Sequence, residues 1–306
     1  MPFHDASYRK HERHFERDLS DPERLAIGRS WFDTTTTDYW RHARAYEGAA
    51  MFQPDPDSRW LTVGDGRYGL DAIRLRGIGF RNVLPTDISS TLLERAKQEG
   101  RIDNYAVENA EALSFGDETF DYVFCKESYH HFPRPALALY QMLRVARKAV
   151  ILVEPNDLRA TPLSRGKHAV KNLLMGRRHY DASNYEDSGN YIYSISRREV
   201  EKVALGMNFP AVASKSLASS YVAGCEFEPG TWRNATYRRI RLRCFMQDVL
   251  AVLALHDRPL LMSVIFKQPP TAAIVEAMSK SGWSLQRLPR NPHSRPMTSK
   301  KGSAGP

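Results

Sequence analysis

Two adjacent histidines, His130 and His131, are the side chains of this sequence best suited to proton transfer. They follow the apolar run Phe120–Cys125, which reads as a buried strand. Imidazole is the natural base near neutral pH because its unperturbed pKa is about 6.5. Glu154 ends another apolar run, Ala149–Val153, and can orient one imidazole or balance its charge. Neighbouring side chains diverge in an extended loop, so we expect only one histidine to point inward. Alternatively, the imidazoles only cap a turn.

A glycine-rich turn is the second chemical feature. Trp60–Val63 reads as a buried strand, and it leads into Gly64-Asp65-Gly66-Arg67-Tyr68-Gly69 before a predicted helix. Gly64 and Gly66 let the backbone turn tightly and approach a ligand that a Cβ atom would block. The first amides of the helix would face that ligand. A strand-to-helix turn without a ligand is the alternative. The residues expected to contact a nucleoside are Gly64, Asp65, Gly66 and Gly69.

Asp87 ends the next predicted strand, Asn82–Asp87, where its carboxylate can accept hydrogen bonds from both ribose hydroxyls. Capping of the following helix is the alternative, but Ser89 or Ser90 already provides a cap. The turn and an acid about 20 residues later also match the dinucleotide fingerprint. A dinucleotide enzyme needs a second mononucleotide half, and no second glycine turn follows Phe120–Cys125. The pattern therefore favours a single nucleoside.

With these motifs the sequence resembles the class I S-adenosylmethionine-dependent methyltransferases, in particular the small-molecule, methyltransferase type 11-like family. Glu108–Phe115 is similar to the family's adenine-binding segment, and Ala149–Pro155 to its fifth strand. The resemblance covers residues 60–160 well and extends loosely to 268. Thr62 stands where the family usually has an acid.

The resemblance implies S-adenosyl-L-methionine as the cofactor, held by its ribose, its adenine and its methionine end. It implies that Asp87 binds the ribose and that Asn109 meets the adenine amino group. The cofactor contacts implied in this way are Asp87, Ile88, Asn109, Ala110 and Lys126.

The loop Glu127–His131 matches, residue for residue, the Glu-Ser-x-His-His loop of similar natural-product sugar methyltransferases. The sequence therefore predicts transfer of a methyl group to a small-molecule, sugar or natural-product acceptor, with O-methylation and a histidine base favoured over C- or N-methylation. Aligning acceptor and methyl group in line is the main catalytic task. Which histidine acts stays open.

Residues 1–50 are rich in charge and read as an N-terminal helical extension. Simple packing on the sheet would explain this extension. The resemblance suggests a lid over the donor pocket, with Tyr39 and Trp40 as the candidate contacts.

The expected fold is α/β, a doubly wound, mostly parallel seven-stranded sheet of the Rossmann-like methyltransferase type. Strand and helix patterns alternate from Arg59 to Pro155, which predicts right-handed crossovers. The methyltransferase domain is expected at 58–268, with a cap-like insertion at 156–195. A C-terminal helix and a basic, disordered tail are expected at 269–306.

The formal charge of +9 over 306 residues raises the alternative of an RNA-directed methyltransferase. Much of the excess lies in the tail, and the run Arg238–Arg243 reads as a solvated helix face, so nucleic acid is not the favoured partner. A non-catalytic donor-binding scaffold is a further alternative. The basic insertion could also rest on a membrane surface.

A cytoplasmic protein is expected, because no signal-peptide pattern or spanning apolar run is found. The three cysteines are scattered, and we expect no metal.

Overall fold

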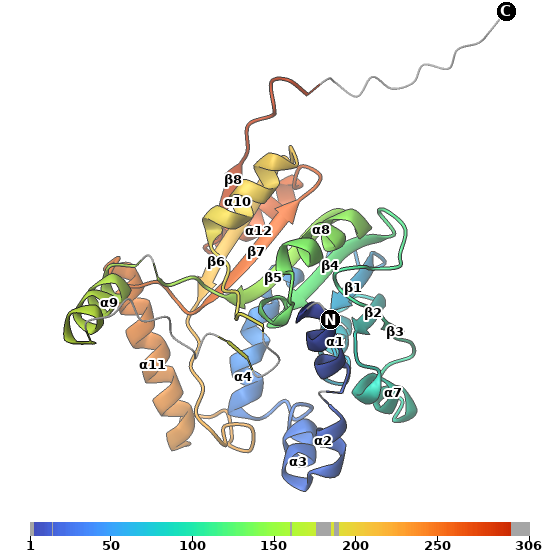
Figure 1. Ribbon diagram of the computed structural model, residues 1–306, viewed down its shortest axis with the longest axis vertical. Coiled ribbons are helices and arrows are strands. Elements are labelled where there is room, and N and C mark those ends of the chain that lie inside the picture. The colour runs from blue at the N-terminus through green and yellow to red at the C-terminus, as the bar shows by residue number, and fades with distance from the viewer. Residues whose placement is uncertain (1–2, 14, 160, 176–184, 187–189, 295–306) are drawn as a thin grey trace, which may run out of the picture.

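A single eight-stranded sheet forms the centre of the computed structural model, which describes residues 3–13, 15–159, 161–175, 185–186 and 190–294 (Figure 1). The strand order is β3-β2-β1-β4-β5-β7-β6-β8. Strands β1 to β5 pair in parallel, whereas β7 runs antiparallel to β5 and β6, and β8 antiparallel to β6. The strands are β1 (Arg59–Val63), β2 (Asn82–Asp87), β3 (Ala106–Val107), β4 (Phe120–Lys126), β5 (Ala146–Pro155), β6 (Ala211–Leu217), β7 (Leu260–Phe266) and β8 (Ser284–Arg287).

Helices pack on both faces of the sheet, as the doubly wound prediction requires. One face is covered by α5, α6 and α12, and the other by α8 and α10, each through its own apolar cluster. The helices are α1 (Phe3–Glu12), α2 (Glu16–Ser20), α3 (Pro22–Ser30), α4 (Thr37–Ala43), α5 (Glu47–Ala50), α6 (Leu70–Ile78), α7 (Thr91–Gln98), α8 (Pro135–Val145), α9 (Pro162–Met175), α10 (Arg197–Gly206), α11 (Ala235–Val252) and α12 (Ala272–Lys280).

The mostly parallel α/β prediction is confirmed, with eight strands instead of seven. The added strand β8 follows α12 and pairs with β6 at the edge of the sheet. Trp283, just before β8, is buried in the main core cluster, and this contact anchors the short strand. Four residues give too little alternation to stand out in a sequence. Residues 295–306 of the predicted tail lie outside the described residues.

The parallel register brings the predicted site residues to one edge. Val63 of β1 is level with Thr86 of β2 and with Cys125 of β4, and Lys126 is level with Val153 of β5. The residues that follow these positions therefore meet at the carboxyl ends of the strands, which is where ligands bind in such sheets.

The N-terminal segment and two later helices extend beyond the sheet (Figure 1). Helices α1 to α4 lie at the carboxyl edge of the strands, while α9 and α11 project away from the sheet. Among the described residues, no helix has both the length and the apolar content needed to cross a membrane.

Candidate active site

The glycine turn after β1 packs directly against the loop after β4. Gly64 has a φ of +74°, and a Cβ atom there would lie 2.4 Å from Cβ of Ser128. The Ser128 hydroxyl donates to the Gly64 carbonyl over 2.7 Å. Gly69, with φ +65°, precedes α6. The left-handed backbone and this close approach explain why glycine occupies position 64.

Asp87 faces Gly66 across the same turn. A Cβ atom at Gly66 would lie 2.6 Å from Cγ of Asp87 and 2.5 Å from Cε2 of Phe15. Backbone N–H groups of Ser89, Gly66 and Ile88 bond the Asp87 carboxylate, yet burial raises its pKa to about 6. Hydroxyl donors fit this carboxylate, since no described cation is paired with it. The arrangement is compatible with a ribose diol, and Phe15 covers it.

The Asp65 carboxylate is bound within the protein, and its contact with the cofactor stays a prediction. Its carboxylate accepts hydrogen bonds from the Thr62 hydroxyl over 2.8 Å and from the N–H groups of Asp71 and Ala72 over 3.0 and 2.9 Å. Burial and the nearby Asp71 raise its pKa well above the ordinary value. The Asp65 side chain therefore points into the protein and caps the start of α6. It accepts hydrogen bonds from N–H groups that have no partner within the helix.

Lys126 belongs to a buried charged network at the end of β4. Its Nζ lies 2.9 Å from Oε2 of Glu127, whose backbone is left-handed, and 3.9 Å from Oδ1 of Asp71. His42 of α4 reaches the same Glu127 carboxylate over 3.3 Å. Burial opposes ionisation, but Lys126 and His42 hold the pKa of Glu127 well below its usual range. Burial and the charge of Lys126 lower the pKa of His42.

This network was only partly predicted, because His42 and Asp71 lie far from Lys126 in sequence. Their side chains meet only after α4 and α6 reach the same edge of the sheet.

His130 and Glu154 form a buried imidazole–carboxylate pair. Nδ1 of His130 lies 2.7 Å from Oε2 of Glu154, which has no exposed surface. Oε1 of Glu154 accepts from the N–H groups of Ser128 and Tyr129, each over 3.0 Å. Burial alone would lower the pKa of His130, but the bond to Glu154 and the charges of nearby glutamates raise it above the ordinary value. The predicted contact between Glu154 and one imidazole is present.

The expectation that the two histidines diverge is wrong. Tyr129–His131 form a short 3₁₀ turn, which places the rings of His130 and His131 3.9 Å apart between centroids. An extended loop would have separated them. His131 is 41% exposed and bonds Glu186 instead of Glu154. The tighter turn thus creates two neighbouring imidazole–carboxylate pairs, one buried and one at the surface.

The predicted adenine loop is tied to the N-terminal helix. Oδ1 of Asn109 accepts from the Glu111 N–H over 2.9 Å, and Ala110 beside it is buried. Glu111 accepts from the Tyr8 hydroxyl of α1 and from Nε of Arg134, both over 2.5 Å. Helix α1 therefore crosses the loop that was predicted to hold adenine.

Tyr39 and Trp40, the predicted lid contacts, pack against other helices of the chain. The Tyr39 ring lies under Arg74 of α6, 4.0 Å from its guanidinium carbon. Trp40 packs on Tyr237 of α11, 5.3 Å between centroids. Thr36 caps α4 by accepting from the Tyr39 N–H. Tyr8 of α1 and Phe15 lie over the predicted adenine loop and the glycine turn, and α4 reaches the Lys126–Glu127 network through His42.

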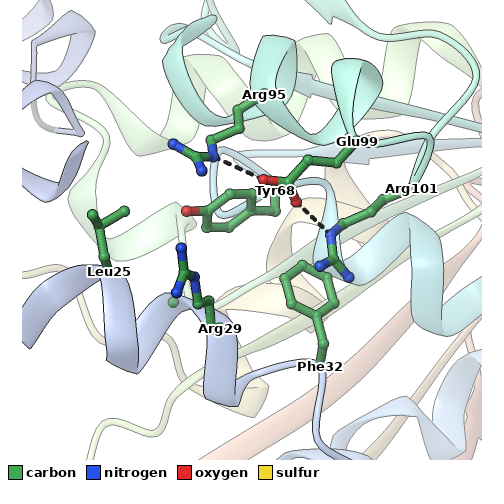
Figure 2. Close-up of a pocket in the computed structure, with 8 residues that line it drawn as sticks. Leu25, Arg29, Phe32, Tyr68, Arg95, Glu99 and Arg101 are labelled. Carbon is green, nitrogen blue, oxygen red and sulfur yellow. Dashed lines mark hydrogen bonds and ion pairs between the residues drawn. The ribbon is translucent and has the colours of Figure 1, made fainter. Parts of the chain in front are cut away.

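Two other groupings lie away from the histidine pair. A cavity of about 320 Å³ is lined by α3, Tyr68 and α7, where Arg95 and Arg101 both pair with Glu99 (Figure 2).

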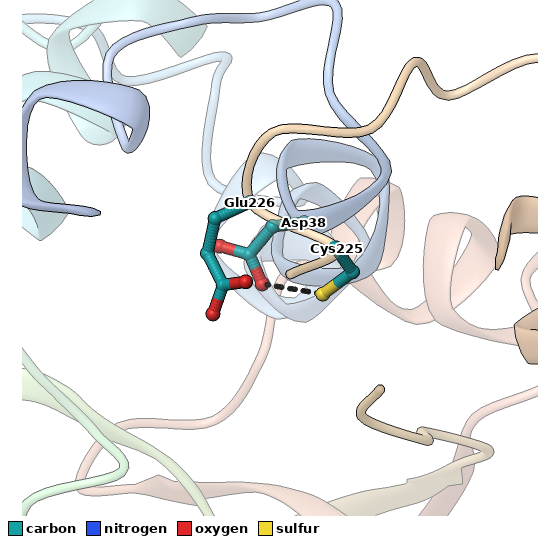
Figure 3. Close-up of side chains that lie close together, drawn as sticks. All are labelled: Asp38, Cys225 and Glu226. Carbon is teal, nitrogen blue, oxygen red and sulfur yellow. Dashed lines mark hydrogen bonds between the residues drawn. The ribbon is translucent and has the colours of Figure 1, made fainter. Parts of the chain in front are cut away.

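Asp38, Cys225 and Glu226 approach one another at a spacing that a metal ion could use (Figure 3). Arg41 already donates two hydrogen bonds to Asp38, at 3.2 and 2.9 Å, which balances that charge. The absence of a metal stays a prediction.

Comparison with known proteins gives a family for the central segment. Residues 61–153 match the family model described as "Methyltransferase domain", type 11. The chain is 34% identical over 141 residues to 2-methyl-6-phytyl-1,4-hydroquinone methyltransferase of Synechocystis sp., which spans 44% of this chain and 44% of that protein. The chain therefore matches less than half the length of this relative.

Two solved structures are similar at low identity. One is a SAM-dependent methyltransferase, possibly a histamine N-methyltransferase, from Thermotoga maritima, at 16% identity over 84% of this chain and 100% of that chain, with a TM-score of 0.44. The other is the YcgJ protein from Bacillus subtilis, at 14% identity over 74% of this chain and 99% of that chain, with a TM-score of 0.47. The domain match identifies residues 61–153 as a methyltransferase domain, and the mostly parallel order of the sheet is compatible with that assignment.

Proposed function

We propose that the protein transfers a methyl group from S-adenosyl-L-methionine to a hydroxyl-bearing small molecule, with His130 as the general base. The observation that carries this proposal is the His130–Glu154 pair, which lies beside the loop that closes on Gly64. An imidazole held by a buried carboxylate at Nδ1 presents Nε2 to the acceptor.

The residues at the strand ends suit the donor. Asp87 would accept the ribose hydroxyls, and Asn109 and Ala110 lie on the loop expected to meet adenine. Lys126 and Glu127 carry opposite charges, which suit the carboxylate and ammonium groups of the methionine end. When bound, S-adenosyl-L-methionine supplies a methyl group activated on a sulfonium sulfur.

His130 would take the acceptor's proton at Nε2 while the acceptor oxygen forms its bond to the methyl carbon and the sulfur–carbon bond breaks. S-adenosylhomocysteine leaves as a neutral thioether. The raised pKa of His130 favours uptake of that proton, and Glu154 stabilises the imidazolium. General-base assistance of this kind is worth roughly 10²–10⁴-fold.

The relative named for a hydroquinone suggests the class of acceptor. Removing a proton from a phenolic hydroxyl increases electron density on the oxygen and on the ring carbons beside it. The same base would therefore serve O-methylation and, on an aromatic acceptor, C-methylation. Sugar and natural-product hydroxyls are handled by the same chemistry.

A product screen tests the proposal. The purified protein is incubated with S-adenosyl-L-methionine and a panel of hydroquinones, phenols and glycosides, and methylated product and S-adenosylhomocysteine are measured by mass spectrometry. Equal amounts of both are expected with at least one acceptor. Tight donor binding by calorimetry without product from any acceptor class would favour a donor-binding scaffold, and methylation of RNA alone would assign the activity to nucleic acid.

A further inference from the structure

Helix α11 carries large apolar side chains on two opposite faces. Its inner face buries Ile240 and Cys244. Its outer face exposes Leu242, Phe245 and Met246, and the Phe245 side chain is 62% exposed. Spacings of three and four residues place these three side chains on one side of a helix. The outer face of α11 therefore exposes large apolar side chains to solvent beside the arginines of the same helix.

The exposed apolar surface continues past the end of α11. Val252 is 80% exposed, and Leu253 and Leu255 are exposed after it. The Leu255 carbonyl accepts from the N–H of Leu163 at the start of α9 over 3.0 Å. The two helices therefore join at this point, and Figure 1 shows them together beyond the end of the sheet.

Helix α9 is amphipathic, and its apolar side is also exposed. Val170, Leu173 and Leu174 share one side of the helix by their spacing, and Leu173 is 83% exposed. Isolated apolar residues are ordinary on a protein surface, but a continuous group on two joined helices marks an interaction site.

Positive charge accompanies these apolar residues. Helix α9 has no acidic residue among Pro162–Met175, and it exposes Arg165 and Lys167. Helix α11 exposes Arg238, Arg239 and Arg243, while Asp248, its one acidic residue, is paired with Arg258. An apolar face bordered by arginine and lysine is typical of helices that lie in the surface of an anionic bilayer.

We propose that the outer faces of α9 and α11 form a docking surface for an anionic lipid bilayer, on which the helices lie flat. A second copy of the chain fits this surface less well. A two-fold interface would place the same arginine-bordered patch of each copy against the other, and the like charges would repel.

The proposed docking surface lies close in sequence to the candidate active site. Strand β5 carries Glu154 near its end, and α9 follows it. Beyond α9, Glu186 bonds His131. The proposed docking surface is therefore joined by short chain segments to both carboxylates that bond the two histidines.

Vesicle flotation tests the docking surface without any need for methyl transfer. The full chain is mixed with vesicles of phosphatidylcholine alone or of equimolar phosphatidylcholine and phosphatidylglycerol. We expect flotation with the anionic vesicles, weakened by high salt. The double variant Leu242→Ser/Phe245→Ser should bind about 100-fold more weakly, because each side chain contributes about tenfold on burial. Lys167→Gln/Arg239→Gln should weaken binding to anionic vesicles only.

Tyr140→Ser is the matched control, since Tyr140 is also a large exposed side chain, on α8 and away from this surface. A second apolar variant, Leu173→Ser/Leu174→Ser on α9, covers the case in which the α11 variant fails to fold. The proposal fails if the parent chain stays unbound to anionic vesicles or if the folded variants bind as the control does. A doubled mass in sedimentation velocity that the same variants abolish would assign the surface to a second copy instead.

Discussion

Replacing Glu154 by glutamine should separate the orientation of His130 from the stability of the fold. The amide oxygen can keep the hydrogen bonds from the Ser128 and Tyr129 N–H groups, so the loop after β4 should stay in place. The amide NH₂ would then face Nδ1 of His130, where the carboxylate oxygen now lies 2.7 Å away. The proton of the neutral imidazole would move to Nε2, the atom that has to accept the proton of the acceptor.

The size of the effect follows from the bond that is lost. A hydrogen bond to a charged partner contributes roughly 1.5–3 kcal/mol. If the Glu154 carboxylate stabilises the imidazolium of His130 only as the acceptor's proton arrives, kcat of Glu154→Gln should fall about 10- to 150-fold. The inverted tautomer would lower kcat further. The donor affinity should not change, since Glu154 is expected to contact no part of the donor.

The pH profile adds a second observable. His130 must be neutral to act, and its pKa is raised above the ordinary value, so activity should rise with pH through a midpoint above about 6.5. In Glu154→Gln the burial of His130 persists without the carboxylate, so this midpoint should move to lower pH. The His130–Glu154 pair also stabilises the fold fully below about pH 6.5, and this contribution is lost as pH rises through the raised pKa. The variant's deficit in melting temperature should therefore be largest in acid.

These quantities are measured by initial rates with isotopically labelled donor from pH 5 to pH 9 and by calorimetric titration of the donor. Glu186→Gln is the matched control, because Glu186 bonds the neighbouring, more exposed His131. Exposed pairs contribute little, so this variant should lose less than a few-fold in kcat. A Glu154→Gln protein with unchanged kcat and an unmoved pH midpoint would refute His130 as the base. If Glu186→Gln alone showed these losses, the base would be His131.

Three further predictions concern the donor side of the site. Asp87→Asn should raise the Kd for S-adenosyl-L-methionine about 100-fold by calorimetry, since two charge-assisted hydrogen bonds are weakened. In the parent protein, donor binding should weaken as pH falls through about 6, where Asp87 takes up a proton. A pH-independent Kd would place the ribose elsewhere. Phe15→Ala should speed donor dissociation in stopped-flow measurements, because this ring covers Gly66 beside Asp87; an unchanged rate would make the N-terminal segment purely structural. Asp65→Ala should lower the free energy of unfolding in urea by about 1–2 kcal/mol, because the cap of α6 is lost, and a variant as stable as the parent would contradict the capping role.

The elements of the sheet could be predicted from the sequence because their signals are local. Buried strands such as Phe120–Lys126 give continuous apolar runs, and parallel strands bring their ends to one edge by geometry alone. The contact between Glu154 and an imidazole followed from this rule. Strand β8 was missed because its place is set by Trp283 in a distant core, which no local pattern reveals.

The parts of the site that the sequence left open depend on contacts between distant residues and on tight turns. The direction of Tyr39 and Trp40 is set by where α4 docks on α6 and α11. The closeness of His130 and His131 depends on a single tight turn, and a change in backbone angles over a few residues decides it. Asp65 had the right position for a ligand contact, but Thr62 beneath it and the amides of α6 bind its carboxylate first. Local sequence gave the location of these side chains and left their partners open.

The tie between α1 and the rest of the chain has a practical consequence for any work with this protein. The Tyr8 hydroxyl donates a hydrogen bond to Glu111 and accepts one from Arg134, residues that are 103 and 126 positions away. The Phe15 ring contacts the glycine turn. An affinity tag placed ahead of Phe3 would adjoin the segment that we expect to cover the cofactor. We expect such a tag to alter how fast spent cofactor dissociates, so that turnover numbers from tagged and untagged preparations would differ. Placing the tag at the opposite terminus avoids this artefact.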